Sequence, residues 1–308
     1  MILSICINPS IDTVTSMDEF KLMEINRTDN IKKVAGGKGN NTARIIKNLG
    51  GEVSVLNMIG GYEGQFILNE FSKIDIPCIY SEIKGDNRRC LAILTKEGIT
   101  ELREAGPKVS QNEYKIFLDK FKEIYKQFEI ITISGSLPQK MTTSAYYDLV
   151  RIVESKKIRV LVDAKSEALA KVIKAKPFMI KVNQEELVEL VGKQLDIKKD
   201  YIEELQKIYK SGVEVVIVTM GEDGLLVNWQ GDFYEVNVPS VKVVSTVGSG
   251  DAVLGGLAYG LANNYSVKET LKLGGSLGTA AAMSAATGQF DINNHNEIYK
   301  KVKVIKLR

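Results

Sequence analysis

The sequence predicts an α/β fold, with a core of mostly parallel sheet flanked by helices and a small β-sheet lid. Short β-branched runs that are apolar throughout recur along the chain, as is typical of strands buried on both faces. Longer segments with helical spacing separate these runs, and this alternation indicates a parallel sheet with helices on both sides. The expected strands are residues 2–7, 53–58, 130–134, 160–163, 179–182 and 213–219.

Two clear helical segments are expected at residues 143–155 and 201–211. In the second, Ile202, Leu205 and Ile208 fall on one helical face. Ligands of such sheets bind beyond the carboxyl ends of the strands, so we expect the functional site there.

Two regions, about residues 10–33 and 78–104, are strand-like but mixed in polarity. Polar and apolar residues alternate in them too often for strands that are buried on both faces, and we interpret them as the strands of the lid. The alternative is a pair of edge hairpins without a role. No linker or repeat divides residues 1–308, so a single domain is expected.

Composition narrows the possible partners. The 308 residues carry a net charge of only +3, which argues against nucleic acid, and no apolar stretch is long enough to span a membrane. The short apolar start lacks the basic region of a signal peptide. Cys6, Cys78 and Cys90 show no CxxC spacing, which fits a cytoplasmic protein. His295 is expected on the surface, so any general base should be a carboxylate or a lysine.

Residues 243–256, VVSTVGSGDAVLGG, indicate a strand, a glycine turn and a helix. Gly248 and Gly250, on either side of Ser249, let backbone amides converge at the helix N-terminus into an anion cradle. Such a cradle can hold the charge of a transferring phosphoryl group. Asp251 in the first turn is either a helix-stabilising acid or the base that deprotonates an attacking hydroxyl.

Residues 35–44, AGGKGNNTAR, open a second helix. They are no Walker A motif, because Gly39 follows Lys38. Lys38, Asn40 and Asn41 offer donors beside glycines that allow close approach of a ligand. Any glycine turn before a helix gives a similar pattern, so the motif is weak alone.

Two further turns follow predicted strands. In 181–186, KVNQEE, Asn183 and Glu186 form either a capping box or ligands of a hydrated magnesium ion. In 218–224, VTMGEDG, Thr219 and Gly221 either contact a nucleotide or belong to a plain hairpin turn.

Polar side chains of the predicted lid form another group. Asp12 either accepts hydrogen bonds from sugar hydroxyls or caps a turn. The basic residues there are either solvated charges or a clamp for a substrate phosphate. They are Arg27, Lys38, Arg88, Arg89 and Arg103.

Taken together, GGKGNNTAR, KVNQEE and TVGSGD occur in an order and at separations that resemble the PfkB (ribokinase-like) carbohydrate kinases over essentially the whole chain. The resemblance implies a ribokinase-like core with a β lid, and transfer of phosphate from ATP with Mg²⁺. It implies Asp251 as catalytic base and the backbone of Gly248, Ser249 and Gly250 as anion hole.

The resemblance also implies the binding residues. Asp12, Gly37 and Asn41 would hold the sugar, and Arg88 matches a position expected to contact the substrate phosphate. Arg27 and Lys38, from the basic set near the lid, are also expected to bind the substrate. Lys181, Asn183 and Glu186 would bind the nucleotide phosphates, and Asn183 and Glu186 would also bind magnesium through water. Thr219, Gly221 and Gly224 would contact ATP, and about residues 271–288 would line the adenine pocket.

Further stretches resemble the hexose-phosphate branch, which includes tagatose-6-phosphate kinase and 1-phosphofructokinase: NPSID, EINR, IKGDNRRCLAIL, TELREAGP and ISGSLP. Around Arg88 and Cys90 the likeness is closer to tagatose-6-phosphate kinase. The expected reaction is therefore tagatose 6-phosphate to tagatose 1,6-bisphosphate. The alternatives are fructose 1-phosphate to fructose 1,6-bisphosphate, or phosphorylation of an unphosphorylated sugar or nucleoside.

Other classes fit less well. A binding protein without catalysis conflicts with the retained Asp251, and a dehydrogenase lacks its dinucleotide fingerprint. The sequence departs from the branch at Val182, where proline is usual, and at residues 163–168, where a glycine is missing. Asn40 replaces an apolar residue and is expected beside the sugar site. Exposed lid strands could pair between subunits of a homodimer.

Overall fold

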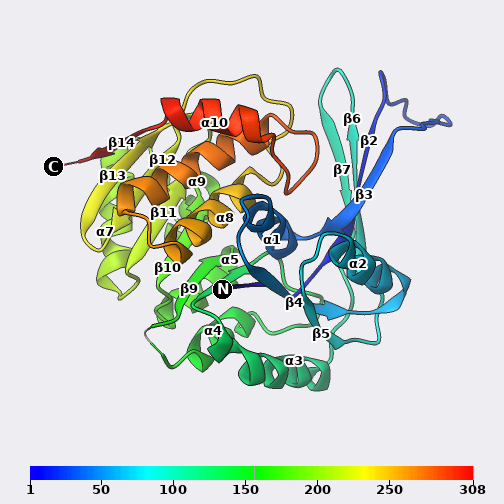
Figure 1. The fold of residues 1–308 in the computed structure, drawn as a ribbon, viewed down its shortest axis with the longest axis horizontal. Coiled ribbons are helices and arrows are strands. Elements are labelled where there is room, and N and C mark those ends of the chain that lie inside the picture. The colour runs from blue at the N-terminus through cyan, green and yellow to red at the C-terminus, as the bar shows by residue number, and fades with distance from the viewer. Residues whose placement is uncertain (156, 308) are drawn as a thin grey trace.

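A ten-stranded sheet forms the centre of the computed structural model, which describes residues 1–155 and 157–307 (Figure 1). The strand order is β14-β13-β12-β11-β10-β9-β8-β1-β4-β5, and all pairs from β5 to β11 are parallel. The strands β12, β13 and β14 add an antiparallel edge. This confirms the predicted mostly parallel sheet. The strands are β1 (Ile2–Cys6), β4 (Val53–Ile59), β5 (Cys78–Glu82), β8 (Ile130–Ser134), β9 (Arg159–Asp163), β10 (Met179–Asn183), β11 (Val215–Thr219), β12 (Leu225–Trp229), β13 (Asp232–Asn237) and β14 (Lys303–Lys306).

Helices cover both faces of the sheet, because side chains of its central strands alternate between two apolar cores. In β1, Leu3 and Ile5 enter one core and Ile2 enters the other. The first core packs against α3 (Gln111–Ile124), α4 (Ala145–Ile152), α5 (Ser166–Lys174), α6 (Gln184–Val191) and α7 (Lys198–Lys210). The second packs against α1 (Lys38–Asn48), α2 (Gly61–Lys73), α8 (Ser249–Ala262), α9 (Val267–Ala282) and α10 (Ile292–Lys301). Short 3₁₀ turns lie at η1 (Tyr125–Gln127) and η2 (Gly221–Asp223).

A separate four-stranded sheet, the lid, projects from the core in Figure 1. Its order is β3-β2-β6-β7, formed by β2 (Ser10–Ser16), β3 (Ile31–Gly36), β6 (Arg88–Leu94) and β7 (Ile99–Arg103). The two central strands, β2 and β6, are parallel, and the outer two pair antiparallel to them. The predicted lid is thus present.

The prediction was wrong about one lid boundary. Residues 78–82 form β5, which pairs with β4 at the edge of the main sheet rather than with the lid. Its side chains are only partly buried because it is an edge strand. A partly buried strand has the same mixture of polar and apolar residues as the lid strands, so the sequence did not distinguish them. The predicted strand before α8 is also wrong, since no strand lies between β13 and α8 in the described residues.

His295 is another correction, because it is buried rather than exposed. It lies in α10 with only 6% of its surface exposed, and its Nε2 is 3.1 Å from Oγ of Ser276 in α9. The polar residues around it in sequence line the outer side of the helix, which hid its burial. Burial lowers the pKa of this imidazole.

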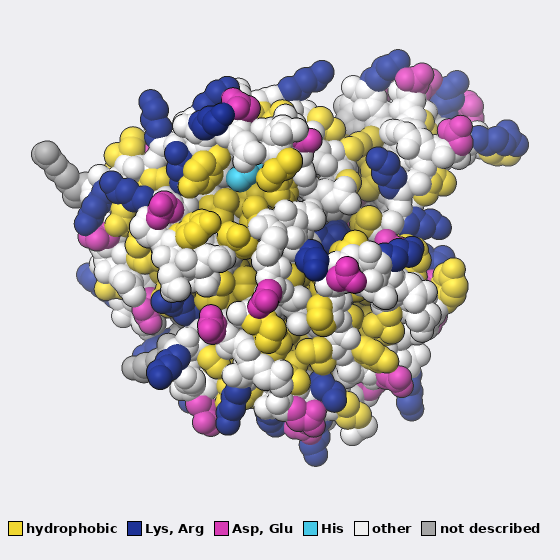
Figure 2. All heavy atoms as spheres, viewed as in Figure 1, with side chains coloured by type: hydrophobic (Ala, Val, Ile, Leu, Met, Phe, Trp, Pro, Cys, Tyr) yellow, Lys and Arg dark blue, Asp and Glu magenta, His cyan; other side chains and the backbone are white. Residues whose placement is uncertain are grey.

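The described helices include none long and apolar enough to cross a membrane. On the face drawn in Figure 2, basic and acidic side chains are interspersed and do not gather into a patch of one sign.

Candidate active site

A cavity of about 890 Å³ lies at the carboxyl ends of β10 and β11 and extends beneath the lid. This volume is within the range of about 300–1,000 Å³ that is usual for small-molecule sites. The cavity is lined by every binding or catalytic residue predicted from the sequence except Arg27, Asn40 and Arg89. The site therefore forms where ligands of parallel sheets generally bind.

The turn before α1 depends on two adjacent glycines. Gly37 has φ +99°, and a Cβ there would lie 2.6 Å from Sγ of Cys6. A Cβ on Gly36 would overlap the carboxylate of Asp12. The glycines thus bring the start of α1 against both the lid and the core, which explains the motif physically.

Asn41 of α1 connects this turn to α8. Its Nδ2 donates to Oδ2 of Asp251 at 2.8 Å, across 210 residues of sequence. Its Oδ1 accepts from Nη2 of Arg44 at 2.6 Å, and the same nitrogen donates to the carbonyl of Thr287 at 3.0 Å. Arg44 therefore fixes the orientation of the amide, and the amide holds the carboxylate of Asp251.

Asp251 is 4% exposed and lies in the first turn of α8. Burial raises its pKa to about 6, and the ammonium group of Lys38 opposes the rise. A carboxyl group with this pKa is ionised near neutral pH yet basic enough to accept a proton from an alcohol.

An anion site lies next to this carboxylate. Gly248 caps α8 in the left-handed region at φ +85°, and in the described chain the amides of Gly248 and Gly250 donate to no protein acceptor. A Cβ on Gly250 would lie 3.2 Å from Nζ of Lys181. Two amides, a helix N-terminus and an ammonium group thus converge, an arrangement that favours phosphate.

Lys38 and Lys181 are held by one fully buried carboxylate, Asp163. Nζ of Lys38 lies 2.8 Å from Oδ1, and Nζ of Lys181 lies 2.8 Å from Oδ2. Burial alone would raise the pKa of Asp163, but the two ammonium groups outweigh it and lower the pKa to about 2. Burial likewise opposes the charge of Lys38, yet the carboxylate keeps the pKa of Lys38 above its ordinary value.

Sequence reasoning missed Asp163 and Arg44. Asp163 ends a predicted strand at the edge where ligands bind, and this position is the signal that could have found it. Arg44 falls three residues after Asn41 on one helix, so a contact between them was foreseeable. Its burial was not, because it depends on the distant loop at Thr287.

On the opposite side, Asn183 and Glu186 form the predicted capping box of α6. Oδ1 of Asn183 accepts from the amide of Glu186 at 2.7 Å, and Oε2 of Glu186 accepts in return at 3.0 Å. Both residues also line the cavity, as do Thr219, Gly221 and Gly224 at the β11–β12 turn. Residues of α9 and the loop after it complete this end: Gly275, Gly278, Thr279, Ala282, Ala285 and Thr287.

On the lid side, Asp12 and Arg88 line the cavity. Arg27 does not; it is exposed in the loop between β2 and β3, so the structure does not bring it to the other predicted residues. Asn40 is fully buried and donates to the carbonyl of Gly36 at 2.8 Å. It does not line the cavity itself, although the neighbouring Asn41 does.

With this geometry established, comparison with known proteins identifies the family. The model of the pfkB family carbohydrate kinases matches residues 2–293. The chain belongs to this family. It is therefore a carbohydrate kinase, a phosphotransferase acting on an alcohol group.

Individual relatives agree with this membership. The chain is 34% identical over its full length, and the full length of the relative, to the tagatose-6-phosphate kinase of Staphylococcus epidermidis. The structure of phosphofructokinase-2 from Escherichia coli with potassium is 28% identical, with a TM-score of 0.90 over 97% of this chain and 98% of that one. A Thermotoga maritima structure at 21% identity shares the fold, with a TM-score of 0.91 over 100% of this chain and 99% of that one.

The raised pKa of Asp251 predicts how the stability of the folded protein depends on pH. Its folded pKa of about 6 exceeds its ordinary 3.8, so its contribution to stability is complete below pH 4 and is lost as pH rises through 6. A rise in this pKa from 3.8 to about 6 corresponds to about 3 kcal/mol of folding free energy. We expect Asp251→Asn to raise the free energy of unfolding by up to that amount at pH 8 and by little at pH 4, measured by urea denaturation.

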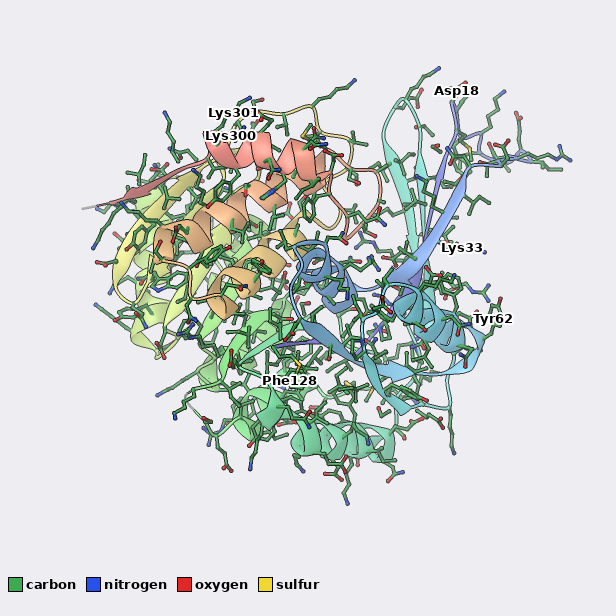
Figure 3. The ribbon with its side chains drawn as sticks, viewed as in Figure 1. Asp18, Lys33, Tyr62, Phe128, Lys300 and Lys301 are labelled. Atoms are coloured by element: carbon green, nitrogen blue, oxygen red, sulfur yellow. The ribbon has the colours of Figure 1, made fainter. Side chains whose placement is uncertain are left out.

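The matched control is Asp18→Asn, since Asp18 is exposed at the tip of the lid (Figure 3). It should change the free energy of unfolding little at either pH. An Asp251→Asn protein less stable than wild type at pH 8 would contradict the assignment of a costly buried charge.

Proposed function

We propose that the chain transfers the γ-phosphoryl group of ATP to tagatose 6-phosphate, giving tagatose 1,6-bisphosphate. The observation that carries the proposal is the convergence of Asp251, the N-terminus of α8 and two ammonium groups in one cavity. The full-length similarity to a tagatose-6-phosphate kinase supports the choice of sugar. The reaction belongs in the cytosol, where thiols such as the unpaired Cys6, Cys78 and Cys90 stay reduced.

ATP fits the end of the cavity between the β11–β12 turn and α9. Thr219, Gly221 and Gly224 would border its phosphates or ribose, and small residues of α9 leave room for the adenine. Lys181 and the amides of Gly248 and Gly250 would bind the phosphates. All of these groups are donors or cations, so they complement the negative charge of the nucleotide.

The side chains at the nucleotide end of the cavity fit magnesium only as a hydrated ion. No cluster of three acidic, histidine or cysteine ligands occurs among residues 1–155 and 157–307. Asn183 and Glu186 supply oxygens, which Mg²⁺ prefers, and Mg²⁺ keeps several waters when it binds ATP. When bound, it would neutralise charge on the phosphates.

Asp251 is the base in this account. The acceptor hydroxyl gives its proton to the carboxylate, the hydroxyl oxygen bonds to the γ-phosphorus, and the bond to the β-phosphate oxygen breaks to release ADP. Asn41 keeps the carboxylate oriented, and Lys38 offsets the charge that builds on the transferring group. Gly37 and Asp12 border the acceptor sugar.

Arg88 on the lid is the proposed contact for the phosphate that the acceptor already carries. It lines the cavity, and among the residues that the structure describes its guanidinium donates only to backbone carbonyls, those of Asn8 at 3.3 Å and Glu104 at 3.4 Å. A phosphate dianion is a stronger partner than either carbonyl.

An ADP-release assay tests the proposal with an acceptor panel. The panel holds tagatose 6-phosphate, fructose 6-phosphate, fructose 1-phosphate, free tagatose and ribose. We expect the highest kcat/KM for tagatose 6-phosphate, no turnover with EDTA, and a loss of about a hundredfold to ten-thousandfold in Asp251→Asn. Asp251→Asn should still bind ATP by calorimetry, because the carboxylate does not hold the nucleotide.

Each alternative has its own outcome. Preference for fructose 1-phosphate would indicate a 1-phosphofructokinase. Turnover of free sugars alone would exclude the proposed contact between Arg88 and the phosphate of the acceptor. Near-normal turnover in Asp251→Asn would exclude this residue as the base.

We further propose that the lid pairs with the lid of a second copy in a homodimer. Within residues 1–155 and 157–307, the outer strands β3 and β7 each have an edge that pairs with no other strand. The lid also carries several exposed apolar side chains, which commonly mark interaction sites. They are Leu22, Met23, Ile25, Ile31, Ile99 and Leu102. One related structure is described as a tetrameric form of Escherichia coli phosphofructokinase-2, which shows that a relative assembles.

Analytical ultracentrifugation tests the dimer. Wild type should sediment as a dimer, and Leu22→Glu with Leu102→Glu should shift it to monomer, because both side chains are more than two-thirds exposed on the lid. The control is Tyr62→Glu, an equally exposed apolar residue on α2 (Figure 3). A wild-type monomer, or a dimer unaffected by the lid substitutions alone, would contradict this interface.

A further inference from the structure

The inner face of the lid carries a second arginine that the proposed function does not use. Cys90 of β6 pairs in register with Asp12 of β2 on one side and with Arg103 of β7 on the other. Residues paired in register point to the same face of a sheet, and all three line the cavity. The lid therefore directs Arg103 toward the same space as Asp12.

Arg88 and Arg103 are diagonal neighbours on this face. Arg88 lies two residues from Cys90 on β6, so it shares the face of Cys90. In an antiparallel pair such diagonal positions are separated by about 7–8 Å, within reach of long side chains. One phosphate group can thus contact both guanidinium groups.

Arg103 is held by a partner that a phosphate can replace. Its Nη2 donates to both carboxylate oxygens of Glu101, at 2.8 and 2.7 Å, and Glu101 also lines the cavity. The Arg103 side chain is 57% exposed, and an ion pair this exposed contributes little to stability. Exchange of the carboxylate for a phosphate dianion would gain charge and acceptor oxygens.

We propose that Arg103 is a specificity-determining residue that leaves Glu101 to bind the acceptor's existing phosphate together with Arg88. The inference rests on the proposed function, in which the acceptor is a sugar phosphate. Glu101 then competes with that phosphate for the guanidinium. Because Arg103 acts on a part of the acceptor that does not react, its loss weakens acceptor binding more than it slows transfer.

The test compares phosphorylated and free acceptors in Arg103→Gln. We expect the KM for tagatose 6-phosphate to rise about tenfold or more, with kcat and the KM for ATP nearly unchanged. The kcat/KM for free tagatose should not change. Arg103→Lys should recover part of the loss, because lysine keeps the charge but not the bidentate geometry.

Two further variants sharpen the test. Lys33→Gln removes a charge from the same lid, but Lys33 points outward from β3 (Figure 3), does not line the cavity and should leave every KM unchanged. Glu101→Gln removes the competitor, so it should lower the KM for tagatose 6-phosphate. Thermal unfolding of each variant should match wild type, since these side chains are exposed or half-buried.

The outcomes separate this inference from the function beneath it. Equal losses on tagatose 6-phosphate and free tagatose in Arg103→Gln would overturn the role of Arg103 and leave the kinase assignment intact. A higher KM in Glu101→Gln would overturn the exchange. A wild-type enzyme without preference for phosphorylated acceptors would remove the proposed substrate class and this inference together.

Discussion

The buried carboxylate of Asp163, held between the ammonium groups of Lys38 and Lys181, is the interaction on which the rest of the cavity depends. A buried charge is tolerated only when it is paired, and breaking such a pair typically costs about 3–5 kcal/mol. Asp163 ends β9, Lys181 lies on β10, and Lys38 opens α1. These three side chains therefore join the sheet to α1, and they fix two cations at the edge of the sheet where the parallel strands end.

This group of three charged side chains determines what Asp251 can do. Asp251 is buried beside it, and its pKa of about 6 reflects burial first, then opposing effects of Lys38 and Asp163. Without the cations, burial would leave the carboxyl protonated and unable to accept a proton near neutral pH. In the proposed reaction the same cations attract the phosphate that reacts, so one cluster would provide both the base and the phosphate site.

Much of this could be predicted because its signals are local. The glycine turn at Gly37, the first-turn position of Asp251 and the capping box at Asn183 each depend on neighbours in sequence. Asp163 was missed because its partner Lys38 is 125 residues away. The burial of His295 depends on packing between helices, and β5 was assigned to the wrong sheet because edge strands and lid strands share one polarity pattern.

The pH dependence of kcat/KM in two variants tests the coupling of these charges most directly. Lys38 lowers the pKa of Asp251 and Asp163 raises it, so removing each should move the acidic limb in opposite directions. We predict that Lys38→Met shifts the limb to higher pH than wild type and that Asp163→Asn shifts it to lower pH, whatever each does to the maximal rate. Limbs that stay in place, or that move the same way in both variants, would contradict the account.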